Sequence, residues 1–252
     1  MEKFIVDYWK TLAFFALVGL VGGFFTGLYV LDSYPEEMRQ QIYDQGLNDV
    51  AVGAVTAVQS ALYGLVLGAG GIFFARKTGL WKDERTITKK PLTAAVIVAI
   101  FGGLAIFLPD VLFFGKHAEV IMDLYAAKPT VSFMIASVLY GGVLEEVMLR
   151  LFVMSLIAFL LHRLFNRKSE KPAAVVLIAA NVIAALLFSA GHLPTTFIML
   201  GSSPVILLRC FLLNGGVGLL LGRLYRKTGL RYAMIAHGGC PVVSKLIWIL
   251  FI

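Results

Sequence analysis

The chain has 252 residues, of which 59% are hydrophobic and 15% are charged, and its formal net charge is +7. Soluble domains carry about 25% charged residues and about 45–50% apolar ones, so an ordinary soluble domain is excluded. The composition predicts an all-α, polytopic membrane protein with lipid as its surroundings and no nucleic-acid partner. We expect one integral membrane domain over residues 1–252, with the recognisable motifs confined to 129–252 and none in 1–128.

Long apolar runs predict a bundle of seven to eight transmembrane helices, because about 20 apolar residues cross the hydrocarbon core as a helix. The runs lie at about 11–31, 52–75, 92–114, 130–162, 173–191, 204–222 and 232–252. The fourth run is too long for one perpendicular crossing, so we expect it to tilt, kink or protrude. An eighth short element could lie within it or around residues 194–204.

The connectors between these runs differ in charge. Lys and Arg concentrate in 76–90, 163–171 and 223–231, whereas 32–51, 115–129 and 192–203 hold almost none. The positive-inside rule therefore predicts a cytoplasmic amino terminus, with all three basic connectors on the same side. Short connectors without large extramembrane domains are typical of a bacterial cell membrane. The segment 34–48 could be a surface helix or a solvated loop.

The fourth run contains charged residues where none are expected, in the stretch YGGVLEEVMLRLFVM. A charge near the bilayer centre costs on the order of 3 kcal/mol. On a helix Glu146 and Arg150 are four residues apart on one face and can pair, whereas Glu145 points about 100° away. A buried ion pair that fixes helix packing would explain Glu146 and Arg150 but not Glu145, which is free to face a cavity.

Two histidines also lie in the apolar runs. Phe188 and His192 share a helical face in LLFSAGHLPTT, where a histidine could equally be a helix-end cap. Two glycines follow His237 and are expected to open room beside its ring. Pro241 then frees the His237 carbonyl from its usual helical partner. Two carboxylates and two histidines are nearly all the groups in the runs that can exchange protons near neutral pH.

The order of these motifs resembles one membrane family, the CPBP or Abi family of intramembrane proteases. This family comprises the type II CAAX prenyl endopeptidases and the bacteriocin-processing enzymes. The resemblance spans about residues 130–241 and consists of Glu145-Glu146-x-x-x-Arg150, Phe188-x-x-x-His192, and His237 after a Gly-rich span and a YRKTGL turn. It implies a hydrolase that cleaves a peptide or protein substrate at the membrane.

The resemblance also implies roles for individual residues. Glu145 would activate a water molecule that His192 helps to hold, and His237 would stabilise the oxyanion. Glu146 and Arg150 would be the supporting pair.

The chain departs from the family pattern in the last motif, which usually reads His-x-x-x-Asn, because Pro241 occupies the fourth position after His237. The second oxyanion donor is then missing or supplied elsewhere, for example by Asn214 or Ser244. Losing one such donor can cost about 100- to 1000-fold in rate.

The cofactor is left open by the sequence. Glu146, His192 and His237 are adequate in number and type to bind Zn²⁺. The HExxH spacing that places two ligands on one helix face is absent. Both a metalloprotease and a glutamate-dependent enzyme therefore remain possible readings.

Three further polar residues lie in the runs. We expect Arg209 and Lys245 to extend toward the membrane boundary, and Asn214 to hydrogen-bond a neighbouring helix.

The site residues differ in their expected depth in the membrane, measured from the basic connectors. Glu146 lies 17 residues before Arg163, about 26 Å along a straight helix. His237 follows Arg231 by only six residues, about 9 Å. The site can assemble only if the helices near 163–171 protrude or the 223–231 turn sinks into the protein.

Three functions fit these features. The first is an intramembrane endopeptidase, and the second is a catalytically weak immunity or scaffold protein that binds a peptide in the same cavity, consistent with Pro241. The third is a proton-coupled transporter, since intramembrane acids and histidines also mark proton relays. Transporters often show paired repeats, whereas these groups cluster in the second half of the chain only.

Overall fold

The structure is a computed structural model that describes residues 2–82, 86–126, 128–165 and 167–251, with side chains from residue 7 to residue 250 outside these gaps. Every regular element in these ranges is a helix. The predicted all-α class is therefore confirmed.

The first part of the chain forms α1 (Glu2–Asp32), α2 (Glu36–Asp44), α3 (Asp49–Thr78), α4 (Lys89–Pro109), the π-helix η1 (Asp110–Phe114), α5 (Gly115–His117) and α6 (Val120–Ala126). The second part forms α7 (Val131–Ala136), the π-helices η2 (Ser137–Glu145) and η3 (Val147–Met154), α8 (Ser155–Phe165), α9 (Ala174–Gly191), α10 (Leu193–Leu200), α11 (Pro204–Thr228) and α12 (Leu230–Phe251).

Six helices in the described ranges are long and apolar enough to cross a membrane, which confirms a polytopic membrane protein. They span Asp7–Asp32, Asp49–Thr78, Lys89–His117, Ala174–Leu200, Pro204–Thr228 and Leu230–Leu250. The long fourth run is helical from 131 to 165 but changes to π geometry in its middle, so it forms a seventh long, irregular element. The expected short element near 194–204 is α10, which follows α9 after His192 alone.

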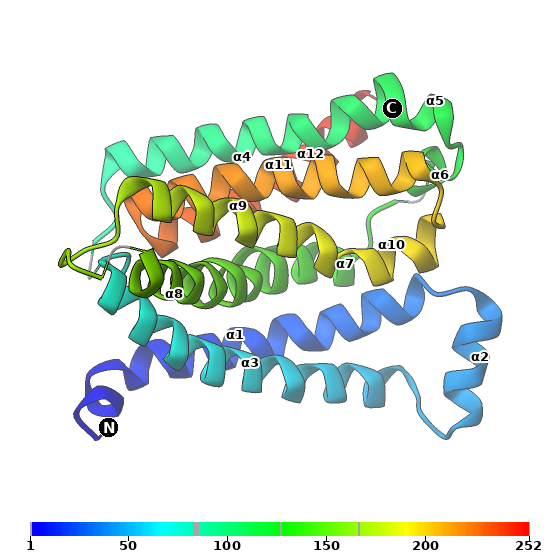
Figure 1. Cartoon of the computed structure of the whole chain (residues 1–252). Coiled ribbons are helices and arrows are strands. Elements are labelled where there is room, and N and C mark those ends of the chain that lie inside the picture. Colours follow the sequence, from blue (N-terminus) through cyan, green and yellow to red (C-terminus); the bar gives the residue numbers. More distant parts are fainter. Residues whose placement is uncertain (1, 83–85, 127, 166, 252) are drawn as a thin grey trace.

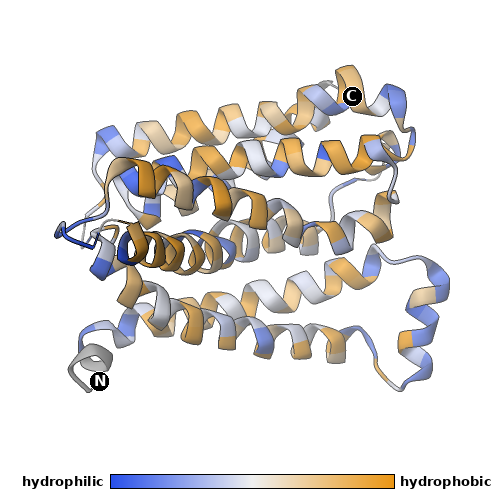
Figure 2. Ribbon diagram, in the orientation of Figure 1, coloured by the Kyte–Doolittle hydropathy of each residue, from blue (hydrophilic) through white to orange (hydrophobic). Residues whose placement is uncertain are grey.

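Consecutive long elements run in alternating directions, as Figure 1 shows. The amino terminus and the α3–α4, α8–α9 and α11–α12 connectors lie at one end of the bundle, on the left of the view. The segment containing α2, the α5–α6 segment, the α10–α11 connector and the carboxyl terminus lie at the other. Hydrophilic residues gather at both ends and hydrophobic ones fill the length between them (Figure 2). The three basic connectors thus share one end of the molecule.

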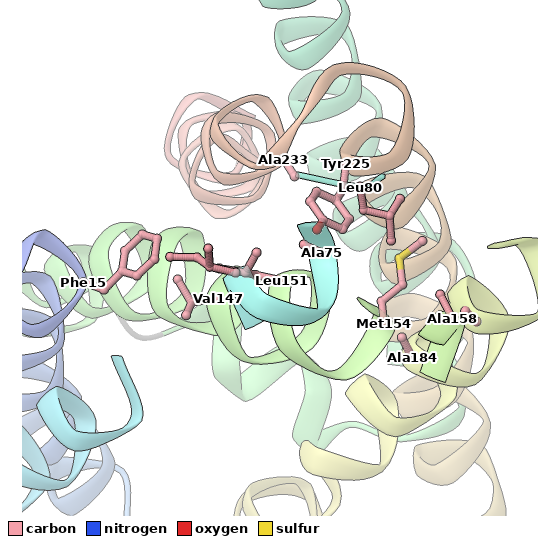
Figure 3. Packing of buried hydrophobic residues seen from close by; sticks show 12 residues of the cluster. Phe15, Ala75, Leu80, Val147, Leu151, Met154, Ala158, Ala184, Tyr225 and Ala233 are labelled. Carbon is pink, nitrogen blue, oxygen red and sulfur yellow. The ribbon is translucent and has the colours of Figure 1, made fainter. Parts of the chain in front are cut away.

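The element η3 lies at the centre of the largest apolar cluster, shown in Figure 3. Val147, Leu151 and Met154 of η3 are completely buried. They pack with residues of α1, α3, α8, α9, α11 and α12, among them Phe15 and Tyr225. Van der Waals packing of this kind holds helices together in lipid, where burial of apolar surface gives little advantage. The packing fixes the segment that carries the two glutamates.

A polar cluster centred on Asp110 lies where η1 meets α6, α11 and α12, and Asp110 was not anticipated from the sequence. Asp110 is fully buried. Its Oδ1 accepts from Arg209 Nε and its Oδ2 from Arg209 Nη2, each at 2.6 Å. Tyr125 Oη also donates to Oδ2, at 2.9 Å. The prediction that Arg209 extends to the membrane boundary is therefore wrong, because a buried carboxylate binds it with two hydrogen bonds.

Lys245 completes this group, which we name the Asp110 cluster (Asp110, Tyr125, Arg209 and Lys245). Its Nζ lies 5.2 Å from the ring centroid of Tyr125, 5.3 Å from that of Phe133 and 5.1 Å from that of Trp248. Aromatic faces attract a cation at such distances, so Lys245 packs inward instead of extending to the boundary as predicted. Burial and the Asp110 carboxylate raise the pKa of Tyr125, which keeps its hydroxyl a donor.

Two smaller expectations have different outcomes. Asn214 donates to the carbonyl of Cys210 in its own helix, at 2.9 Å, because the carbonyl one turn earlier is within reach of its short side chain. The predicted bond to a neighbouring helix is therefore wrong. The segment 34–48 contains the short exposed helix α2, as the surface-helix reading predicts.

Candidate active site

The two glutamates lie where one π-helix gives way to the next. Glu145 is the last residue of η2, and Glu146 separates η2 from η3. A π-helix has i→i+5 hydrogen bonds and is found mostly as short bulges near functional sites. It takes more residues per turn than an α-helix, so it advances less per residue. The local backbone therefore differs from the straight α-helix used to estimate depth.

Glu146, Arg150 and His237 form a buried charged group. Glu146 Oε1 accepts a hydrogen bond from His237 Nδ1 at 2.8 Å and lies 3.3 Å from Arg150 Nη1. Glu146 is 0% exposed and Arg150 1% exposed. The ion pair expected from the i, i+4 spacing is present, and it extends to a histidine 91 residues further along the chain.

Glu145 faces the opposite side of the same imidazole. Its Oε2 lies 3.7 Å from His237 Nε2, and its side chain remains 19% exposed. Two polar atoms this far apart can both bind one water molecule at ordinary hydrogen-bond lengths. His237 is thus held on one ring nitrogen by Glu146 and presents the other beside Glu145.

The ring of Phe188 connects His192 to this group. It packs edge-to-face on His192, with centroids 4.7 Å apart, and on His237, with centroids 5.5 Å apart. The guanidinium of Arg150 lies 4.6 Å from the centroid of the same ring. His192 Nδ1 donates to the Phe188 carbonyl at 2.9 Å, so Nε2 is left as an acceptor in the neutral ring. Within the described ranges no ion pair or hydrogen bond joins His192 directly to Glu145.

A glycine contact brings η2 and α12 together at the site. A Cβ added to Gly142 would lie 2.7 Å from the Cα of Gly238, closer than real Cβ atoms approach. This close approach allows His237 to reach the glutamates. On the other side of α12, a Cβ added to Gly239 would lie 2.7 Å from the Cβ of Ala99 in α4, so this glycine also allows close helix packing. That the two glycines open room beside the His237 ring stays a prediction.

Three partners of the site segment were not anticipated from the sequence. Arg150 Nη2 donates to the Gly218 carbonyl of α11 at 3.3 Å. Ser155 Oγ donates to the Arg150 carbonyl at 3.4 Å and lies 3.0 Å from Tyr225 Oη, also on α11. These bonds fasten the carboxyl end of η3 to α11. Backbone acceptors carry no sequence signal, and only the Tyr in the quoted YRKTGL turn could have suggested the contact.

The structure brings Glu146 and His237 together despite the depths expected from straight helices, with Glu146 Oε1 2.8 Å from His237 Nδ1. Residues 147–154, between Glu146 and α8, are π-helical and so advance less per residue than an α-helix. The turns of α8 overlap in Figure 1 whereas those of α11 are spread out, so α8 is inclined to α11. Glu146 therefore lies nearer the basic end of the bundle than a straight helix predicts.

The position of Pro241 leaves the expected second oxyanion donor unassigned. Pro241 lies inside α12 and cannot donate to the His237 carbonyl. Asn214 already donates within its own helix. Ser244 is buried seven residues beyond His237 on α12. A donor role for Asn214 or Ser244 therefore stays a prediction.

The donor set does not fit a metal ion. No group of three or more His, Cys, Asp or Glu side chains is arranged to hold one in the ranges that the structure describes. Glu146, His192 and His237, the ligand set that the sequence suggested, do not form such a group in these ranges.

Together, the fold and the site define a polytopic helical membrane protein with an acid–base cluster between its helices. Residues 127–243 match the family described as type II CAAX prenyl endopeptidase Rce1-like, which is a family of membrane proteases. The match contains every motif residue and confirms the resemblance over about 130–241. No curated protein and no solved structure matches the chain.

Proposed function

We propose that the protein is an intramembrane endopeptidase that hydrolyses a peptide bond of a membrane-proximal peptide, with Glu145 activating the attacking water. One observation carries the proposal. Glu145 Oε2 and His237 Nε2 face each other across 3.7 Å, while the other nitrogen of the same ring is bound to Glu146 at 2.8 Å. A base for water and a donor for the oxyanion are the two groups that amide hydrolysis needs first.

The charges of the site support this assignment. Two carboxylates, Glu145 and Glu146, stand beside one permanent cation, Arg150. A doubly protonated His237 would balance the second carboxylate, and buried charges are tolerated when they are paired. In that form Nδ1–H is donated to Glu146 and Nε2–H is available to an oxyanion.

The reaction follows from these positions. Glu145 accepts a proton from the water, whose oxygen attacks the scissile carbonyl carbon. The carbonyl oxygen becomes an oxyanion that accepts the Nε2–H of His237. When the C–N bond breaks, protonated Glu145 returns its proton to the leaving amine. His192 would accept a hydrogen bond from the same water through Nε2.

We also propose an orientation and a location. The three basic connectors and the amino terminus share one end of the bundle (Figure 1). The positive-inside rule supports a cytoplasmic position for that end. The short connectors support a bacterial cell membrane as the location.

A cleavage assay tests the proposal. Purified protein in lipid nanodiscs is incubated with a library of membrane-proximal peptides, beside Glu145→Ala and His192→Ala variants, and products are identified by mass spectrometry. Cleavage by the wild type and by neither variant is the expected result. Equal cleavage by all three would indicate a contaminating protease and overturn the proposal.

Peptide binding without turnover by the wild type would favour the scaffold reading instead. The specific observation behind that alternative is Pro241 at the position where the family carries a side-chain donor.

A further inference from the structure

The helix α3 carries two hydrogen-bonding side chains in an exposed position halfway along its length. Gln59 and Tyr63 follow the first residue of α3, Asp49, by 10 and 14 residues, about 15 and 21 Å. Tyr63 is 37% exposed, and Gln59 is exposed as well. The hydrocarbon core is about 30 Å thick and offers no hydrogen bonds. These positions therefore call for a polar partner other than lipid.

The two side chains satisfy each other only in part. Gln59 Nε2 donates to Tyr63 Oη at 2.9 Å. An amide has a second N–H and a carbonyl oxygen, and the phenol keeps its own O–H. One amide hydrogen, the amide oxygen and the phenol hydrogen thus remain available to a ligand.

The face of α3 that carries Tyr63 turns toward η3, the element that directly follows the two glutamates. Gly70 lies seven residues after Tyr63, hence on the same helical face. A Cβ on Gly70 would lie 2.9 Å from the ring of Phe152 in η3. This face of α3 is therefore covered by η3 at Gly70 and exposed at Tyr63.

Tyr140 extends this series toward the catalytic carboxylate. It precedes Glu145 by five residues within η2, and the i→i+5 repeat of a π-helix places both on one side. The element η2 is in contact with α3, the helix that carries Gln59 and Tyr63. In the described part of the chain this hydroxyl has no hydrogen-bond partner. The polar series thus runs from the exposed face of α3 to the site.

We propose that Gln59, Tyr63 and Tyr140, named here the polar strip, bind the backbone of an extended segment of the peptide substrate and direct it to Glu145. The inference rests on the proposed endopeptidase function. A helix in lipid pairs its own N–H and C=O groups, and these must be unpaired before a peptide bond can be attacked. The strip offers both donors and acceptors to the unpaired groups, which a lipid tail could not use.

Binding to a catalytically inactive background tests the strip separately from catalysis. The Glu145→Gln protein in nanodiscs is titrated with the library of the cleavage assay, and bound peptides are quantified by mass spectrometry. Three substitutions are added singly to that background: Gln59→Leu, Tyr63→Phe and Tyr140→Phe. A further variant combines Gln59→Leu with Tyr63→Phe. Tyr43→Phe serves as control, since it removes a phenol of α2, outside the spans, that donates to Asp49. Leu62→Ala alters an exposed apolar neighbour on α3.

Each strip variant should weaken peptide binding about two- to tenfold, and the pair at least about tenfold, which is the range of one or two neutral hydrogen bonds. Both controls should stay within about twofold of the background. The proposal is overturned if the strip variants bind as the controls do, or if the background binds no peptide. If the wild type cleaves no peptide but binding still depends on the polar strip, the proposed endopeptidase function is refuted and the proposed role of the strip in binding is not.

Discussion

The molecule contains two charged clusters within its apolar helices, and they differ in how completely their hydrogen bonds are made. In the Asp110 cluster both carboxylate oxygens accept from Arg209 at 2.6 Å, and Tyr125 adds a third bond. At the candidate active site Glu146 Oε2 has no hydrogen-bond partner among the described residues. Glu145 approaches His237 only to 3.7 Å.

This difference indicates which cluster stabilises the fold and which one reacts. A buried carboxylate with all of its bonds made has nothing left to offer a substrate, and it joins distant helices instead. A carboxylate left short of partners can bind water or a reacting group. We infer that the Asp110 cluster stabilises the bundle and that the Glu145–His237 pair performs the reaction.

Asp110→Asn should cause the largest change, a loss of about 3–5 kcal/mol in unfolding free energy, because it leaves Arg209 without its buried counter-charge. The change is measured by denaturant or thermal unfolding in lipid. Cleavage per folded molecule should remain close to wild type.

The matched control removes both charges. Asp110→Asn with Arg209→Met should recover much of the lost stability, since no unpaired charge is then buried. A double variant no more stable than the single one would show that the pair does not act as proposed.

His237→Asn should lower kcat about 100- to 1000-fold with little change in unfolding temperature. The Asn amide can still donate to Glu146 in place of Nδ1, but nothing replaces Nε2 beside Glu145. His237→Gln, whose amide reaches the Nε2 position, should restore part of the activity. Unchanged turnover in His237→Asn would remove His237 from the mechanism.

Gly142→Ala should destabilise the protein by about 1–3 kcal/mol, because a methyl group would overlap the backbone of Gly238. The neighbouring Gly141→Ala is the matched control, since its Cβ meets only Glu145 Oε2, at 4.0 Å. The unfolding midpoints of the two variants are compared, and that of Gly142→Ala should be the lower. Equal stability of both would contradict the close contact between η2 and α12.

Lys245→Met should have the smallest effect, a loss of about 1 kcal/mol, because it removes only the attraction between the ammonium and three rings. Lys116→Met, at an exposed position, should have none. A large loss of cleavage in Lys245→Met would contradict the assignment of the Asp110 cluster to structure.

Local and periodic features of the sequence predict much of this molecule. Apolar run lengths predict the helices, and the i, i+4 spacing predicts the contact between Glu146 and Arg150. The ordered motifs predict the family and place His237 at the site. Each of these follows from residues near one another in the chain or from a motif.

Long-range geometry could not be predicted in the same way. Asp110 and Arg209 are 99 residues apart, and each alone has the pattern of a boundary residue. The π geometry of 137–154 has no propensity signal, so depths based on an α-helix placed Glu146 too far from His237. The packing of Gly142 against Gly238 depends on how two helices cross, which spacing within one helix does not determine.

The most direct test of the account follows the oxygen of water. The wild type and Glu145→Gln are incubated with a cleaved peptide in H₂¹⁸O, and the new carboxyl terminus is analysed by mass spectrometry. The account predicts one ¹⁸O atom in that carboxyl group with the wild type and no product with Glu145→Gln. An unlabelled terminus, or labelled product at the wild-type rate from Glu145→Gln, would contradict it.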